Sequence, residues 1–132
     1  MQELNDGTHR ALVTPALAGG FAGDDVIALS ADGVPQVIAR GGNVGVQLFA
    51  LAHDEANIEA LADEAERLGG WLDGFHPSVV VVTFPIRVGF VAIETLVRNY
   101  YEQRAGIASE WTYANVYEAD GETPIGWWDH HA

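Results

Sequence analysis

The run "VVVVTFPI", Val79 to Ile86, constrains the fold more than any other stretch, because only Thr83 interrupts its apolar character. Side chains on a strand alternate between two faces, so a strand of nearly continuous apolar residues is covered on both. Its β-branched residues favour a strand over a helix, and Pro85 is expected to close that strand. The run therefore predicts a sheet strand with other structure on each side.

The segment "HDEANIEALADEAERLGG", His53 to Gly70, predicts an amphipathic helix. Apolar residues recur at spacings of three and four and form one stripe: Ile58, Leu61, Ala65 and Leu68. A second stripe at similar spacing is acidic: Glu55, Glu59, Asp63 and Glu66. Asp54 suits the N-cap, and Gly69 and Gly70 supply a left-handed stop. The helix dipole favours the early carboxylates, but the later ones lie beyond its reach and need another explanation.

From Gly42 onward the signals follow the order β-α-β-β-α-β. "VGVQLFALA" alternates as a strand and precedes the acidic helix, and "WLDGFHPS" precedes the apolar run. A second helix is predicted in "VGFVAIETLVRNYYEQRAG", with a buried side made of Phe90, Ile93, Val97 and Tyr100. "SEWTYANVYEA" alternates as the last strand.

Before Gly41 the signals are for short strands and turns. "RALVTPAL" is a candidate first strand, and "DDVIALS" and "VPQVIAR" are two more, separated by the hairpin signal "ADG". These two adjoining strands predict a β-ribbon, which either extends the following sheet or caps it. The sequence thus predicts an α+β fold: an N-terminal β-ribbon, then a ferredoxin-like or ACT-like half whose antiparallel sheet has both helices on one face. We expect one domain over 1–132, with a β-rich segment at 1–41, the ferredoxin-like part at 42–118 and a tail at 119–132.

Charge and composition exclude several function classes. Nineteen Asp and Glu residues face six arginines and no lysine, which gives a net charge of −13. Binding to nucleic acid or to an anionic membrane depends on basic residues, so we expect neither partner. Without cysteine there is no disulfide, thiolate zinc site or cysteine nucleophile. No apolar run is long enough to cross a bilayer and no secretory pattern opens the chain, so we expect a cytoplasmic protein.

Candidates for catalysis are few. His53 stands beside Asp54 and could form an acid-base pair, and His76 precedes a proline in "GFHPS". Asp129, His130 and His131 are suitable metal ligands by type, but adjacent residues converge poorly on one ion. No serine has a nucleophile motif. We therefore predict no catalytic residues, no metal and no cofactor.

Two stretches are candidates for binding. "RGGN", comprising Arg40, Gly41, Gly42 and Asn43, can present an arginine and backbone N–H groups to an anion, or can simply be a turn. In the tail, Trp127 and Trp128 can be exposed anchors for a protein partner, or can fold back over the core.

The stretches "AGDDVIAL" and "RGGNVGVQL" resemble a family of small bacterial domains of unknown function. The shared features are Gly23, Asp24 and Val26 at a strand entry, followed by the Gly41 to Asn43 turn. The resemblance covers most of the chain. It implies the same architecture and brings no catalytic residues.

The leading hypothesis is a non-enzymatic domain that binds a basic protein, most concretely an immunity or antitoxin-like inhibitor of a basic toxin enzyme. Its predicted contacts are the acidic stripe and the terminal indoles: Glu55, Glu59, Asp63, Glu66, Trp127 and Trp128. One alternative is an ACT-like regulatory domain that binds a small ligand near Arg40 to Asn43 and dimerises through its sheet. Another is a small enzyme that uses His53 or His76 with a carboxylate.

Overall fold

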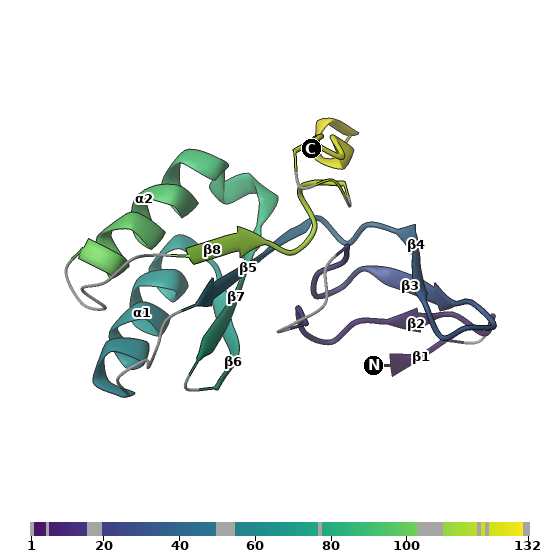
Figure 1. The fold of residues 1–132 in the computed structure, drawn as a ribbon, viewed down its shortest axis with the longest axis horizontal. Helices are drawn as coiled ribbons and strands as arrows, with labels where there is room; N and C mark the ends of the chain where they lie inside the picture. Colours follow the sequence, from purple (N-terminus) through teal and green to yellow (C-terminus); the bar gives the residue numbers. More distant parts are fainter. Residues whose placement is uncertain are drawn as a thin grey trace.

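The computed structural model contains two antiparallel sheets and two α-helices (Figure 1). It describes residues 2–4, 6–15, 20–49, 55–76, 78–102, 110–118, 120 and 122–130. Within these ranges no helix has the length and apolarity that a membrane span requires.

The second half of the chain forms one four-stranded sheet. Its strands are β5 (Asn43–Phe49), β6 (Trp71–His76), β7 (Val79–Pro85) and β8 (Glu110–Tyr113), in the spatial order β6-β7-β5-β8. All neighbouring strands are antiparallel. Helix α1 (Glu55–Leu68) lies between β5 and β6 in sequence, and α2 (Phe90–Tyr100) lies between β7 and β8, after the 3-10 turn η1 (Ile86–Val88). The predicted β-α-β-β-α-β order is confirmed.

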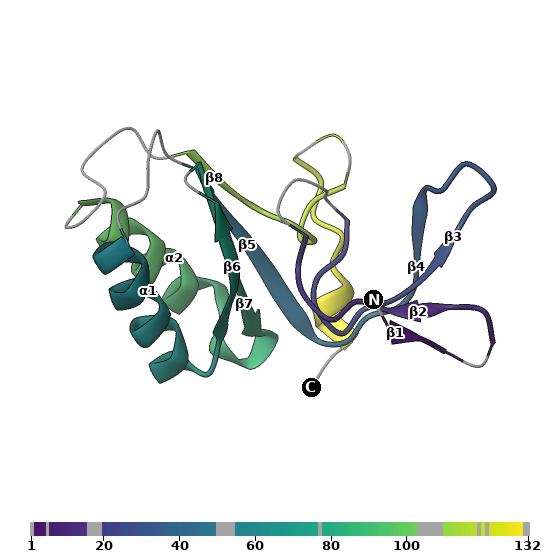
Figure 2. The ribbon, with the colours of Figure 1, turned by 90° about the horizontal axis from the view of Figure 1, so that it is seen from below.

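Both helices lie on one face of this sheet (Figure 2). The predicted apolar side of α1 buries Ile58, Leu61 and Ala65, and that of α2 buries Ile93, Val97 and Tyr100. They pack against alternate residues of the two central strands: Val44, Val46, Leu48, Val80, Val82 and Phe84. Alternation of side chains along a strand puts these residues on one face, and they form the main core.

The opposite face of the sheet contacts the N-terminal segment, residues 11–15, through Thr14 and Pro15. Thr14 and Thr83 share a hydrogen bond of 2.7 Å between their hydroxyl oxygens, and Gln47 donates to the carbonyl of Pro15. A Cβ on Gly45 would lie 2.3 Å from Cγ2 of Thr14, so the two segments meet where β5 has no side chain. All but the last residue of β7 are buried, as the sequence predicts for this strand.

The first forty residues form a separate four-stranded sheet. Its strands are β1 (Gln2–Glu3), β2 (His9–Arg10), β3 (Val26–Leu29) and β4 (Pro35–Ala39), paired in chain order. The "ADG" turn joins β3 to β4 as predicted, and Gly33 adopts a positive φ of 79°. This ribbon therefore does not extend the other sheet by pairing with it.

The predicted strand "RALVTPAL" is wrong in its position. The strand there is only His9–Arg10, and the following described residues, 11–15, leave the ladder. Their backbone groups bond elsewhere: the N–H of Ala11 donates to the carbonyl of Asp25, and the N–H of Thr14 donates to the Asp73 carboxylate. Contacts with distant segments have replaced local strand pairing.

Helix α1 ends as its two glycines predict. Gly69 has a φ of 97°, its N–H donates to Glu66, and the N–H of Gly70 donates to Ala65. This pair of bonds is a Schellman motif, which satisfies carbonyls at the helix end. The predicted N-cap, Asp54, lies outside the described residues.

Candidate functional site

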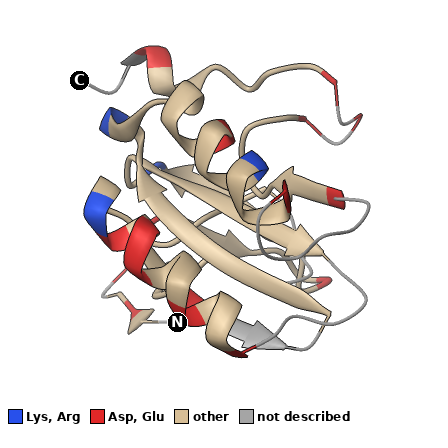
Figure 3. Cartoon of the chain, turned by 90° about the vertical axis from the view of Figure 1, so that its left-hand side faces the viewer, with Lys and Arg blue, Asp and Glu red and all other residues tan. Residues whose placement is uncertain are grey.

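The acidic stripe of α1 lies on the surface. Its four members are all exposed: Glu55, Glu59, Asp63 and Glu66. Figure 3 shows acidic residues following one another along the helix, with a basic residue at one end. In the described part of the chain none of the four side chains makes an ion pair or a hydrogen bond. Like charges four residues apart destabilise a helix by about 0.2–0.5 kcal/mol each, so the stripe opposes the stability of α1.

A shallow groove of about 370 Å³ lies between α1 and α2. Leu68, Ala92 and Leu96 contribute apolar surface to it, while Glu64 and Arg67 add charge. Leu68 is exposed, and Val91, on the outer side of α2, is 80% exposed. The helical face therefore combines unpaired carboxylates with accessible apolar side chains.

The tail folds back over the core, which is the second of the two arrangements that the sequence left open. Trp127 is only 8% exposed, and its Nε1–H donates to the carbonyl of Asn115 at 2.8 Å. Trp128 is half-buried, and its ring meets that of Phe90 edge to face at a centroid distance of 5.2 Å. The indole of Trp127 is therefore not an exposed anchor, because the core and the hydrogen bond already hold it.

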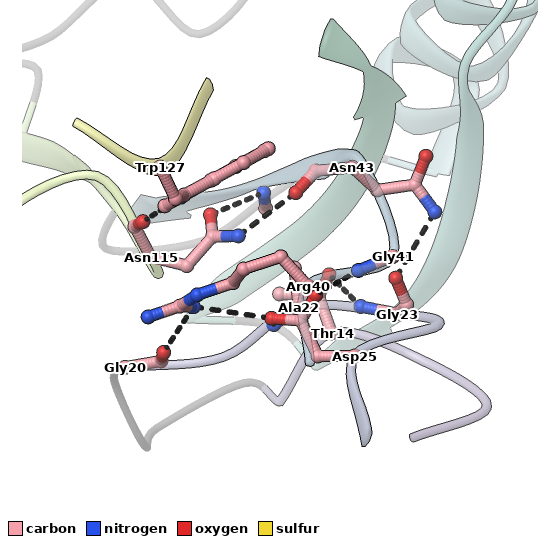
Figure 4. A network of polar contacts seen from close by, with 11 residues as sticks. Thr14, Gly20, Ala22, Gly23, Asp25, Arg40, Gly41, Asn43, Asn115 and Trp127 are labelled. Carbon is pink, nitrogen blue, oxygen red and sulfur yellow. Dashed lines mark hydrogen bonds and ion pairs between the residues drawn. The ribbon is translucent and has the colours of Figure 1, made fainter. Parts of the chain in front are cut away.

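The Arg40 to Asn43 stretch joins the two sheets (Figure 4). Nη1 of Arg40 lies 3.2 Å from a carboxylate oxygen of Asp25 and donates to the carbonyl of Gly20 at 2.7 Å. Its guanidinium also lies 6.0 Å from the centre of the Trp127 ring. The N–H of Gly41 donates to the other oxygen of Asp25. The predicted anion-binding arginine is thus paired within the protein.

Asp25 is fully buried at this junction. Burial raises the pKa of its carboxyl, while hydrogen bonds from the N–H groups of Gly41 and Ala22 and the charge of Arg40 oppose that shift. Asn43 is also buried, and its amide donates to the carbonyl of Gly23 and the carboxylate of Asp24. Every one of these partners comes from the N-terminal half. Asn43, the first residue of β5, therefore connects the second sheet to that half.

A second polar cluster at the joint was not predicted. Asp73 on β6 accepts hydrogen bonds from the Thr83 hydroxyl, the Thr14 N–H and the Trp71 indole N–H. Burial raises the pKa of Asp73, and these donors oppose the rise. One sequence feature indicated this cluster: a carboxylate stands in the middle of the strand "WLDGFH". A carboxylate on a half-buried strand needs hydrogen-bond donors around it.

A cavity of about 430 Å³ lies beside the joint, at the edge of the sheet where α1 ends. Its lining combines the glycine turn with η1 and the start of β6: Gly41, Gly42, Asn43, Gly69, Trp71, Pro85, Ile86 and Arg87. Three of the four residues predicted for a ligand site line this cavity, and Arg40 does not. Arg87, which no sequence pattern indicated, supplies the positive charge of the lining instead.

The histidines provide no described acid-base constellation. His53 and His131 lie outside the described residues, and the side chains of His76 and His130 are also outside that description. Across the described residues there is no group of three or more His, Asp or Glu that could hold a metal ion.

The fold and these surfaces define a small α+β domain with a polar joint between two sheets and an acidic helical face. The chain belongs to the family described as "Domain of unknown function (DUF4265)", whose model matches residues 1–109. The resemblance inferred from the Gly23 and Gly41 stretches to a family of small domains of unknown function is thereby confirmed.

One solved structure is similar, a hypothetical protein from Neisseria gonorrhoeae. The two share 19% sequence identity with a TM-score of 0.65, over 86% of this chain and 79% of that one. At this identity the likeness concerns the fold alone. No curated protein matches the chain significantly.

Proposed function

We propose that this protein binds a basic protein through its helical face. The observation that carries the proposal is the row of exposed, unpaired carboxylates on α1: Glu55, Glu59, Asp63 and Glu66. These charges weaken the helix that bears them, which a surface kept only for solubility could avoid by spreading them out. Complementary charge accelerates encounter and selects among partners.

The groove between the helices supports the same proposal. An interface needs an apolar centre as well as a charged rim, and Leu68, Ala92 and Leu96 offer an apolar centre, with Glu64 in the same lining. A basic segment with apolar side chains fits this groove, and the stripe on another side of α1 adds attraction for a basic partner. We assign no anchoring role to Trp127, because its indole is committed to the core.

The most concrete form of the proposal is an immunity-type inhibitor that covers the active site of a basic toxin enzyme. Carboxylates can occupy the place of a phosphate-rich substrate, and close charge pairs at such interfaces have large coupling energies. An inhibitor of this kind needs no catalytic group of its own.

The test compares two triple variants of equal charge. Glu59→Gln, Asp63→Asn and Glu66→Gln neutralise the stripe, while Glu3→Gln, Glu118→Gln and Glu122→Gln neutralise three exposed carboxylates elsewhere. The intact protein is used to capture basic proteins from extracts of its own source, and a captured protein is then purified and titrated calorimetrically at low and high salt. We expect at least about tenfold weaker binding for the stripe variant alone.

Equal losses of affinity in the two variants would show that net charge alone accounts for the weaker binding, and would contradict the proposal. Failure to recover a basic protein would also count against it. The inhibitor form requires more: a captured enzyme must lose activity when the wild-type protein is added, and keep it with the stripe variant.

A further inference from the structure

The cavity beside the glycine turn differs in charge from two other cavities of the described structure. Two other cavities in the described structure carry a carboxylate in their lining, Glu64 in the groove between the helices and Glu110 beside Trp111. The lining of this cavity has Arg87 and no acidic residue. In a chain of net charge −13, a cavity with a cation and no carboxylate favours an anionic occupant.

Arg87 is available to such an occupant. Its side chain is exposed, and within the described residues it makes no ion pair or hydrogen bond. Arg40 differs on each point, because it is partly buried and paired with Asp25. A guanidinium presents several N–H donors in one plane, which suits carboxylate and phosphate oxygens.

The walls around Arg87 are held in place. The N–H of Ile86 donates to the carbonyl of Gly42 at 2.8 Å, which fixes η1 against the glycine turn. The Trp71 indole N–H donates to Asp73 at 2.9 Å, so the ring that lines the cavity is oriented. Gly42 has a φ of 88°, and a Cβ on Gly41 would lie 2.5 Å from the carbonyl oxygen of Asp24. A site that is already ordered loses less entropy when a ligand binds.

We propose that this cavity binds a small organic oxyanion, with Arg87 as the cation and Trp71 as an apolar wall. Arg87 contributes the charge contact, and the indole offers a flat surface to a planar or apolar body. Carboxylates and phosphates share the chemistry that the cavity recognises. The site is independent of the helical face, so either proposal can fail without the other.

The test follows the backbone N–H of Gly42 and the indole N–H of Trp71 by NMR in the full chain. The probes are benzoate, phenyl phosphate and inorganic phosphate at millimolar concentration, with benzyl alcohol as the uncharged control. We expect saturable shifts of both signals with one or more oxyanions and none with benzyl alcohol. Benzoate alone would identify a carboxylate ligand, and the two phosphates would identify a phosphoryl group.

Two variants make the assignment specific. Arg87→Gln replaces an exposed guanidinium that has no partner among the described residues, so the fold should persist, and binding should weaken at least tenfold. Arg98→Gln makes the same charge change on an exposed arginine of α2 and should bind as the wild type does. The proposal is overturned if no oxyanion shifts the two signals, if Arg87→Gln binds as well as the wild type, or if both variants weaken equally.

Discussion

The two four-stranded sheets of this protein are stabilised in different ways. The second sheet lies between two helices and the N-terminal segment, and its core cluster contains sixteen buried residues. Among the described residues the cluster of the first sheet contains three, Ala11, Phe21 and Ile27, with Val37 packed against them. A cluster of that size contributes little against the entropy of ordering the chain. The first sheet therefore depends on its polar junction with the second, through groups such as Asp25 and Asn43.

The largest expected effect comes from the core of the second sheet. Phe84→Ala removes a fully buried ring from β7 and should lower the free energy of unfolding by about 3–5 kcal/mol. Hydrogen exchange should then accelerate in both sheets, because the first sheet has lost its support. Chemical denaturation with mass spectrometric exchange measures both quantities.

The matched change in the first sheet is Ile27→Ala, which also removes a fully buried side chain. Faster exchange should here be confined to the first sheet, while the amides of β7 remain protected. Acceleration throughout the chain would show that the two sheets unfold as one unit, and would contradict the asymmetry.

The next effect is expected at Asn115, which bonds to the first residues of β5 beside the junction. Asn115 is fully buried, accepts from the N–H of Gly45 and donates to the carbonyl of Asn43. Asn115→Ala leaves both backbone groups without these partners and should destabilise the protein by about 2–4 kcal/mol. Asn99→Ala, at an exposed position of α2, is the control and should change stability by less than about 0.5 kcal/mol. Similar denaturation midpoints for the two variants would argue against a stabilising role of the Asn115 hydrogen bonds.

A smaller effect is expected where the two halves touch. Gly45→Ala places a Cβ against Thr14 and should cost about 1–3 kcal/mol, since one of the two segments must move. Gly74→Ala on β6 is the control, because a Cβ there meets nothing within 4 Å. Thermal denaturation of the two variants measures the difference. If Gly45→Ala is as stable as Gly74→Ala, the close approach of the N-terminal segment to β5 is wrong.

The smallest effect is a change in pH dependence at Asp73. Because burial raises its pKa, the folded state binds more protons than the unfolded state between the ordinary value of 3.8 and the folded value. The stability that this shift contributes is fully present below 3.8 and is lost as the pH rises through the folded value. Asp73→Asn removes the titrating carboxyl and with it this pH-dependent contribution to stability. Denaturation curves from pH 3 upward should show a less steep loss of stability for Asp73→Asn, and parallel profiles would contradict the expectation.

Local patterns predicted much of the fold. The three- and four-residue spacings identified α1, the glycine pair identified its end, and "ADG" identified the hairpin of β3 and β4. The β-branched run at Val79 predicted a strand buried on both faces. Each of these features depends on neighbours within a few residues, which a sequence shows directly.

The junction could not be predicted, because its partners are distant in the chain. Thr14 and Asp73 are 59 residues apart, and no periodicity connects them. The same limit explains why the pairing of Arg40 was not predicted. Its sequence context suited an anion site, but its guanidinium bonds to Asp25, fifteen residues earlier in the chain. The sequence could not decide whether Trp127 is exposed or buried for a similar reason, since its hydrogen-bond partner Asn115 belongs to another segment. Arg87 was overlooked because a single arginine after a strand carries no pattern.

The free edge of β4 has a consequence for how copies of this protein behave in solution. Among the described residues this strand pairs with β3 alone, four of its five residues are exposed, and none is charged. An uncharged edge strand can pair with a strand of another molecule, and a proline at its first position lowers that tendency only in part. Repulsion between highly acidic molecules supplies the rest of the protection. Near pH 4.4, where the net charge vanishes, this repulsion disappears, so self-association should set in there first.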